Sequence, residues 1–261
     1  MIGIFDSGLG GLTAVKELRR LMPGEPLIYF GDTGRVPYGS RSAATIVKYA
    51  SQDAAFLLSQ GVDAILIACG TVSTTALKEL EKALPVPVIG VVEPAAEAAV
   101  KATINGKIAV IGTPATIRTG AFEAALRARM PEAEVISRPC PLFVPLVEAG
   151  FTAPDCEITR LTCEHYLAPI RESGADTLIL GCTHYPLLAP ILSEILPGVT
   201  LISSGAEAAK TMATLRGQHR EGAAPVRYYV SDDPTLFVAS GGAFLGCDIS
   251  GEVEKIDIER F

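Results

Sequence analysis

The sequence lacks the features that mark membrane, secreted and nucleic-acid-binding proteins. No apolar run approaches the roughly 20 residues that a membrane-spanning helix needs, and no basic, apolar signal peptide opens the chain. The 22 lysine and arginine residues form no block and the formal net charge is −7, which argues against binding to a phosphate backbone. We therefore expect a cytoplasmic protein that binds neither a membrane nor nucleic acid.

Metal-binding and nucleotide-binding motifs are also missing. The six cysteines form no CxxC pair, and the three histidines are too few and too scattered for an obvious zinc site. The glycines of Gly8-Leu9-Gly10-Gly11 lack the GxGxxG spacing of a dinucleotide loop, and no GxxxxGKS/T motif occurs. The sequence predicts no bound metal and gives little support to a nucleotide site. In a reducing compartment the cysteines should be free thiols, most of them in the core.

What the chain does contain is a regular alternation of short apolar segments with amphipathic ones. Hydrophobic residues make up 49% of the chain and charged residues 20%, as in a well-packed globular protein. The alternation predicts an α/β fold of mainly parallel sheets with helices on both faces. The predicted strands are residues 2–5, 26–30, 64–68, 86–91, 107–111, 134–137, 177–180 and 200–202. The predicted helices are residues 12–21, 43–60, 75–83, 119–129 and 156–173.

The chain also contains an approximate internal repeat. Residues 63–71 (DAILIACGT) parallel residues 176–183 (DTLILGCT), and each has an acidic residue, an apolar strand and then a cysteine near a threonine. The opening strand has its own counterpart in residues 107–111. The repeat predicts two lobes with approximate twofold symmetry, although strand–turn–helix patterns are common enough in α/β proteins to recur by chance.

Cys69 and Cys182 each follow a predicted strand and precede a predicted helix. Ligands of doubly wound sheets bind beyond the carboxyl ends of the strands, where such loops converge. A thiol at a helix N-terminus meets the positive end of the helix dipole, so we expect a lowered pKa and a thiolate. Two such thiols in related lobes suit racemisation, in which one face of a planar carbanion loses a proton and the other gains one. Taken singly, either cysteine would more simply be a small core residue.

Each thiol needs a group that tunes it. His184 lies two residues after the second cysteine and can stabilise a thiolate or relay a proton near neutral pH. Asp6 closes the first strand and could orient or deprotonate a group near the first cysteine, or serve only as a helix cap. His165 and His219 are expected on the surface.

Taken together, these loops closely resemble glutamate racemase, in the aspartate/glutamate racemase superfamily. The resemblance runs in order through most of the chain, and only the C-terminal part is less diagnostic. The segments that carry it are 3–13 (GIFDSGLGGLT), 31–33 (GDT), 36–40 (VPYGS), Ala68-Cys69 with Thr71, 90–94 (GVVEP), Gly112-Thr113, Cys140-Pro141-Leu142 with Glu148, and 181–186 (GCTHYP).

The resemblance implies interconversion of L- and D-glutamate without pyridoxal phosphate, metal or other cofactor, supplying D-glutamate for bacterial peptidoglycan. It implies that Cys69 and Cys182 are the acid/base pair, acting on D-glutamate and L-glutamate respectively. The assisting residues that it implies are Asp6 and His184, with Asp32 and Glu148 as possible support. The substrate-binding residues that it implies are Asp6, Ser7, Tyr38, Gly39, Gly70, Thr71, Thr183 and His184.

The resemblance also implies two α/β lobes with the site between them, the second lobe inserted into the first. We therefore expect residues 1–94 and 206–261 to form lobe one and residues 95–205 to form lobe two. A homodimer is implied as well.

One position departs from the family pattern. The motif after the first cysteine is usually Cys-Asn-Thr, whereas this chain reads Cys69-Gly70-Thr71. Loss of the asparagine side chain, which is expected to bind the substrate, would cost about 1–3 kcal/mol if a buried partner were left unpaired. This leaves open an impaired enzyme, or a racemase of aspartate or another amino acid. A two-lobed binding protein without chemistry is the alternative from another class, and the retention of both thiols argues against it.

Overall fold

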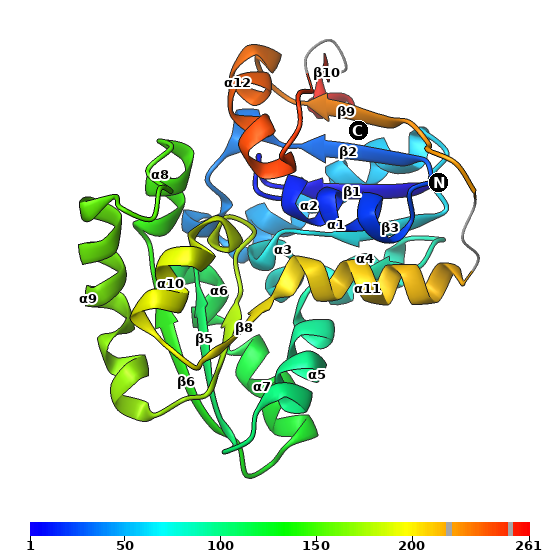
Figure 1. Cartoon of the computed structure of the whole chain (residues 1–261). Coiled ribbons are helices and arrows are strands. Elements are labelled where there is room, and N and C mark those ends of the chain that lie inside the picture. Colours follow the sequence, from blue (N-terminus) through cyan, green and yellow to red (C-terminus); the bar gives the residue numbers. More distant parts are fainter. Residues whose placement is uncertain (218–220, 250–252) are drawn as a thin grey trace.

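Two parallel β-sheets organise the chain, and each forms the centre of a separate lobe with helices around it (Figure 1). The computed structural model describes residues 1–217, 221–249 and 253–261. Within these ranges, no helix combines the length and apolar character needed to cross a membrane. The α/β class predicted from the alternation of segments is confirmed.

The first sheet has six strands in the order β10-β9-β2-β1-β3-β4, and the second has four in the order β6-β5-β7-β8. Every pairing that joins the strands in these sheets is parallel. The strands of the first sheet are β1 (Ile2–Asp6), β2 (Leu27–Gly31), β3 (Ala64–Ile67), β4 (Val88–Ile89), β9 (Val226–Val230) and β10 (Val253–Lys255). Those of the second are β5 (Lys107–Gly112), β6 (Glu134–Pro139), β7 (Thr177–Leu180) and β8 (Thr200–Ser203).

The two sheets share one pattern of strand neighbours. The run β2-β1-β3-β4 in the first sheet has the same order as β6-β5-β7-β8 in the second. The opening strand of each unit is therefore central, and the strand that leads to a cysteine, β3 or β7, lies beside it. The internal repeat predicted from the sequence is confirmed by this shared topology. β9 and β10 extend the first sheet beyond β2, and the second sheet has no counterpart to them within the described residues.

The helices follow the strands as a parallel topology requires, since each strand must be brought back to the same edge of the sheet. They are α1 (Leu12–Leu21), α2 (Ala43–Ser59), α3 (Gly70–Thr75), α4 (Leu77–Ala83), α5 (Val92–Ala102), α6 (Pro114–Arg118), α7 (Ala121–Arg129), α8 (Phe143–Glu148), α9 (Glu157–Ser173), α10 (Ala189–Ile195), α11 (Ser204–Arg216) and α12 (Pro234–Leu245). Four short 3-10 helices are η1 (Thr33–Arg35), η2 (Tyr38–Ser40), η3 (Tyr185–Leu188) and η4 (Ile258–Arg260).

Most predicted elements are present, with shifted ends. All eight predicted strands exist, whereas β9, β10 and several helices, including α5 and α11, were not predicted. The predicted helix over 119–129 starts two residues later as α7, because Gly120 has a positive φ of 65° and separates it from α6. His165 is exposed, as expected, and His219 lies outside the described residues.

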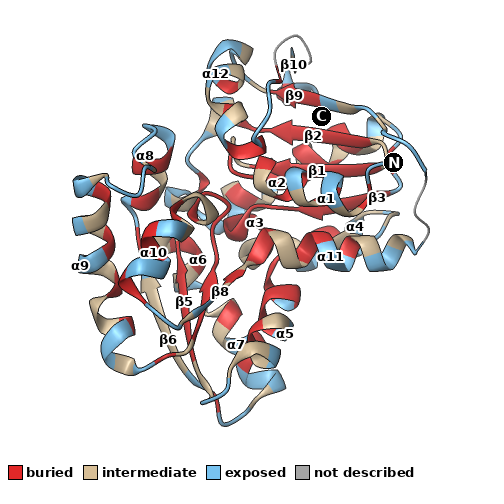
Figure 2. Ribbon diagram, in the orientation of Figure 1, coloured by how far each residue is buried: buried red, intermediate tan, exposed pale blue. Residues whose placement is uncertain are grey.

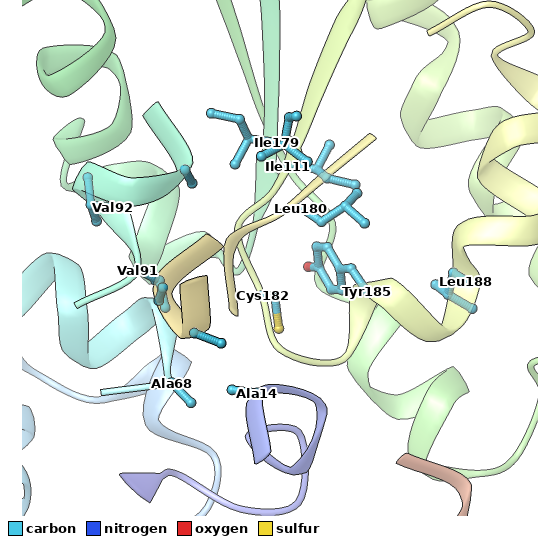
Figure 3. Packing of buried hydrophobic residues seen from close by; sticks show 14 of the residues in the cluster. Ala14, Ala68, Val91, Val92, Ile111, Ile179, Leu180, Cys182, Tyr185 and Leu188 are labelled. Atoms are coloured by element: carbon cyan, nitrogen blue, oxygen red, sulfur yellow. The ribbon is translucent and has the colours of Figure 1, made fainter. Parts of the chain in front are cut away.

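The lobes share a hydrophobic core across their junction. One cluster of buried side chains runs from Ala14 and Ala68 in the first lobe, through Val91, to Leu180 and Tyr185 in the second (Figure 3). The central strands of both sheets are buried along their length, and exposed residues lie mainly on the outer faces of the helices (Figure 2). Helix α11 packs against both α1 and α5 and so joins the two units. The expected lobe boundaries, at residues 94 and 206, fall within α5 and α11 and remain a prediction.

The loop after β2 is held in place by two buried carboxyl groups and one guanidinium group. Asp32 and Asp53 are both fully buried and share the guanidinium of Arg35, whose Nε lies 2.6 Å from Asp32 Oδ2 and whose Nη2 lies 2.9 Å from Asp53 Oδ1. The Tyr38 hydroxyl donates to Asp32, and its oxygen lies 3.1 Å from Asp53 Oδ2. Ser231 Oγ donates to Asp32 Oδ1 at 2.7 Å and so ties the loop to the segment after β9.

The hydrogen bonds of Asp32, Asp53 and Tyr38 can all form if one of the two carboxyl groups is protonated. Burial, reinforced by the neighbouring Asp32, raises the pKa of Asp53 well above its usual range. A protonated Asp53 can donate to the Tyr38 oxygen while the Tyr38 hydroxyl donates to Asp32. The Arg35 guanidinium then pairs with Asp32 and, at 3.3 Å, with Glu259, and Asp53 adds no further negative charge.

This arrangement predicts that replacing Asp53 and replacing Asp32 will lower the free energy of unfolding by different amounts. We expect Asp53→Asn to change the free energy of unfolding at pH 7 by less than about 1 kcal/mol, because an amide resembles a neutral carboxyl group. We expect Asp32→Asn to cost about 3–5 kcal/mol, because donors from Arg35, Tyr38 and Ser231 all converge on this buried side chain. Urea unfolding followed by circular dichroism measures both, and equal destabilisation would contradict the assignment of the proton to Asp53.

Candidate active site

A cavity of about 370 Å³ lies between the lobes, at the carboxyl ends of both sheets. Its walls come from the loops after β1, β2 and β3 in the first lobe and after β5, β6 and β7 in the second. All the residues predicted for the site line this cavity, except Asp6 and Asp32. Among the described residues, no group of three or more His, Cys, Asp or Glu side chains is arranged to hold a metal ion.

Cys69 stands at the end of the loop after β3 and is the N-cap residue of α3. It is 5% exposed, and its Sγ lies 3.7 Å from Ser7 Oγ. Burial, reinforced by the Asp6 carboxylate, raises the pKa of the Cys69 thiol to about 12, although the Val72 amide at the helix N-terminus acts in the opposite direction. The lowered pKa expected from the helix dipole is therefore wrong for Cys69, which rests as a thiol.

Cys182 occupies the equivalent position after β7 in the second lobe. It does not cap an α-helix, because the next helical element is the 3-10 helix η3, which begins three residues later. Its Sγ lies 3.9 Å from Nδ1 of His184, and both side chains are buried. Cys182 thus has a histidine as its immediate polar neighbour, where Cys69 has a hydroxyl group.

His184 is held between polar groups on two sides. Its Nε2 lies 3.0 Å from Glu148 Oε1 on α8, and its Nδ1 lies 3.3 Å from Thr183 Oγ1. Burial opposes a charge on the ring, but the hydrogen bonds with Cys182 and Glu148 outweigh it and raise the pKa of His184 to about 10. With Nε2 donating to Glu148, Nδ1 is the atom that can exchange a proton with Cys182. The ring also packs edge-on against Phe244 at 5.4 Å between centroids.

Asp6 lies beneath the cavity rather than in its wall. It is fully buried and accepts a hydrogen bond from the Gly8 amide at 3.1 Å. Thr183 Oγ1, from the opposite lobe, donates to Asp6 Oδ1 at 3.5 Å. Burial raises the pKa of Asp6, against the lowering effect of His184 and nearby backbone amides. The position suits a residue that supports the lobe junction near both thiols.

Asp32 does not line the cavity and reaches it only through its hydrogen bond with Tyr38. Its carboxylate accepts hydrogen bonds from Tyr38, Arg35 and Ser231, and only the tyrosine of these lines the cavity. Asp53 completes this support on the far side of Tyr38, and the sequence did not single it out. Its position in the middle of an amphipathic helix gave no signal, because a carboxylate there is usually exposed.

A cluster of hydroxyl groups crosses the cleft. Thr71 Oγ1 in the first lobe lies 3.1 Å from Thr113 Oγ1 and 3.4 Å from Thr116 Oγ1 in the second. The sequence places the loop 113–116 at the edge of the sheet where ligands bind, but it assigned neither Thr113 nor Thr116 a role in the site. Their loop follows β5, the counterpart of β1, whose own loop supplies Ser7. Cys140 also lines the cavity and was likewise not predicted.

The chain is similar over its whole length to proteins of one kind. The family model described as Asp/Glu/Hydantoin racemase matches residues 13–212. A glutamate racemase of Geobacter metallireducens is 44% identical over 271 residues, covering 99% of this chain and 97% of the relative. One of Enterococcus faecalis is 41% identical, covering 95% of this chain and 92% of the relative.

Solved structures agree with the sequence comparison. The structure of glutamate racemase from Francisella tularensis in complex with D-glutamate has a TM-score of 0.92 and 38% identity, covering 100% of this chain and 98% of that one. Aspartate racemase of Picrophilus torridus, at 17% identity and a TM-score of 0.62, shares the fold alone. This chain therefore belongs to the Asp/Glu/hydantoin racemase family and, within it, to the glutamate racemases, and it is an amino-acid racemase.

Proposed function

We propose that the chain interconverts L- and D-glutamate by moving the α-proton between Cys69 and Cys182, without a cofactor. The observation that carries this proposal is that two thiols from equivalent positions of the two lobes line one cavity. Its substrate is supported by relatives named glutamate racemase and by the Francisella structure with D-glutamate.

Because Cys69 rests as a thiol, it can act as the acid when L-glutamate is converted. Cys182, next to His184, takes the α-proton from one face, so the C–H bond breaks and an S–H bond forms. The Cys69 thiol then gives its proton to the opposite face and becomes the thiolate. In the reverse direction Cys69 acts as the base towards D-glutamate, and the proton states of the two cysteines are exchanged.

The remaining residues bind the substrate and its developing charge. The α-proton of an amino acid is a weak acid, so negative charge on the substrate's carboxylate must be stabilised as the proton leaves. Hydroxyl and amide donors from Ser7, Thr71 and Thr183, together with Tyr38 and Gly39, are proposed to hold the carboxylates, with His184 supplying positive charge. Glu148 acts through His184, whereas Asp6 and Asp32 act from beneath the cavity. Exclusion of water strengthens these contacts.

The biological setting is part of the proposal. D-glutamate made by this reaction would supply peptidoglycan synthesis in the cytoplasm, and the active form would be a homodimer. The lobes of the proposed enzyme are residues 1–94 with 206–261, and residues 95–205. Sedimentation equilibrium of the purified protein tests the dimer directly.

Replacing either active-site thiol should abolish turnover. We expect Cys69→Ser and Cys182→Ser to lower the racemisation kcat by about 10²-fold or more, because a hydroxyl group is a far weaker acid and its conjugate base is rarely formed. Polarimetry with L-glutamate and with D-glutamate measures the rate in each direction. Assays with L-aspartate in parallel test the alternative substrate.

The matched control is Cys247→Ser, which changes an exposed thiol outside the cavity. It should racemise glutamate at the rate of the unmodified protein. Turnover by both active-site variants at that rate would refute the two-thiol mechanism, and faster turnover of aspartate than of glutamate would refute the substrate.

The pKa of His184 predicts the alkaline side of the pH profile. Racemisation of L-glutamate, as kcat/KM, should fall as the pH rises through about 10, because His184 then loses the proton that supplies positive charge beside Cys182. Glu148→Gln removes a negative partner that raises this pKa, so the fall should begin at a lower pH. Glu97→Gln, which changes an exposed carboxylate on α5 paired with Lys101, should leave the profile unchanged. An alkaline limb at the same pH in Glu148→Gln would argue against the role of this pair.

A further inference from the structure

Two glycines, Gly70 of the first lobe and Gly181 of the second, face one another closely across the cavity. A Cβ atom built on Gly70 would lie 2.1 Å from the carbonyl oxygen of Gly181, whereas ordinary contacts of carbon atoms are about 3.5–4.0 Å. The obstructing atom belongs to the backbone, so no side-chain rotation can relieve the contact. Any residue with a Cβ at position 70 must therefore move one lobe away from the other by about an ångström or more.

Gly181 cannot retreat into its own lobe to make room. Its amide donates to the Ile111 carbonyl oxygen at 2.8 Å, which fixes it to the central strand β5. A Cβ on Gly181 would itself lie 2.8 Å from that oxygen and 3.1 Å from Phe122 Cε2, so the space behind it is filled. The displacement would have to be taken up by opening the cleft.

A second glycine of the first lobe lies close to the other end of this loop, where the neighbouring atoms belong to side chains. A Cβ on Gly10 would lie 2.1 Å from Thr183 Oγ1 and 2.5 Å from His184 Nδ1. The segment 181–184, which carries Cys182, thus faces a glycine of the first lobe at each end, Gly70 at one and Gly10 at the other. The lobes therefore approach one another closely at the segments that hold the thiols.

We propose that Gly70 is a positioning residue that sets the distance across which Cys69 and Cys182 act, an inference that rests on the proposed two-thiol mechanism. Gly70 follows Cys69 directly and Gly181 precedes Cys182 directly, so their contact fixes the spacing of the two thiols. A side chain at position 70, including the asparagine of the family motif, would widen the cleft of this chain. Glycine here is therefore an adaptation to closer lobes and not simply the loss of a substrate contact.

The test is Gly70→Ala, with Gly70→Asn in parallel, assayed with L-glutamate in deuterated water. We expect kcat for racemisation to fall about 10²-fold in both, because a displacement of about 1 Å misplaces the second thiol. Proton removal by Cys182 does not need Cys69. Once the Cys182 S–H has exchanged with deuterated water, return of the deuteron to the same face of the carbanion should still label the L-glutamate that remains. The ratio of deuterium in residual L-glutamate to D-glutamate formed, measured by NMR and chiral chromatography, should rise at least tenfold over the unmodified protein.

The control is Gly205→Ala, which adds the same methyl group to a buried glycine of α11 whose Cβ would meet only ordinary contacts of 3.6 Å or more. Its ratio should equal that of the unmodified protein. Should Gly70→Ala fail to fold by circular dichroism, Gly70→Asn, which adds a Cβ at the same position, replaces it with the same expected rise.

The outcomes separate this inference from the proposed function. If the unmodified protein neither exchanges nor racemises glutamate, the proposed function fails. If it racemises and a folded Gly70 variant keeps both kcat and the ratio within twofold, the positioning role is overturned. An increase of kcat in Gly70→Asn would overturn it as well.

Discussion

Parallel pairing of the strands is the constraint on which the site depends. A parallel sheet collects the loops that follow its strands at one edge, and two such sheets with the same strand order present equivalent loops to one another. β3 and β7 hold the same place in their sheets, so the residues that follow them, Cys69 and Cys182, face a common cavity. The proposed chemistry of two opposed thiols would follow directly from repeating one topology and joining the copies across a shared core.

Burial decides the electrostatics of this cavity more than helix dipoles do. The Cys69 thiol stands at a helix N-terminus and yet has a raised pKa, because the loss of water outweighs one favourable amide. Asp6, Asp32 and Asp53 are all fully buried beneath or beside the cavity, where each needs a donor or a cation to be tolerated. His184, with Cys182 on one side and Glu148 on the other, keeps its proton far above neutral pH. The two walls are alike in backbone and unlike in charge.

The sequence predicted much of this because the strands and the two cysteines are local patterns. Apolar runs ending in Cys69 and Cys182 located the core strands and the residues that line the cavity. β9 was missed because the segment before it gave no clear pattern, although Tyr228-Tyr229-Val230 is a plausible buried strand. The support of Tyr38 by Asp53, the raised pKa of Cys69 and the contact of Gly70 with Gly181 depend on segments far apart in the chain. Such contacts are set by packing, which single-chain patterns do not contain.

The two walls of the cavity differ, but thermodynamics limits the effect that this difference can have on the reaction. Enantiomers have equal free energies in water, so the equilibrium constant of racemisation is one, and the kcat/KM values for L-glutamate and D-glutamate must be equal. A histidine beside Cys182 and a serine beside Cys69 can make one enantiomer bind more tightly, but the same preference must then slow its conversion in proportion. The difference between the two lobes can therefore change KM and kcat for each enantiomer, but only together. The final mixture remains racemic.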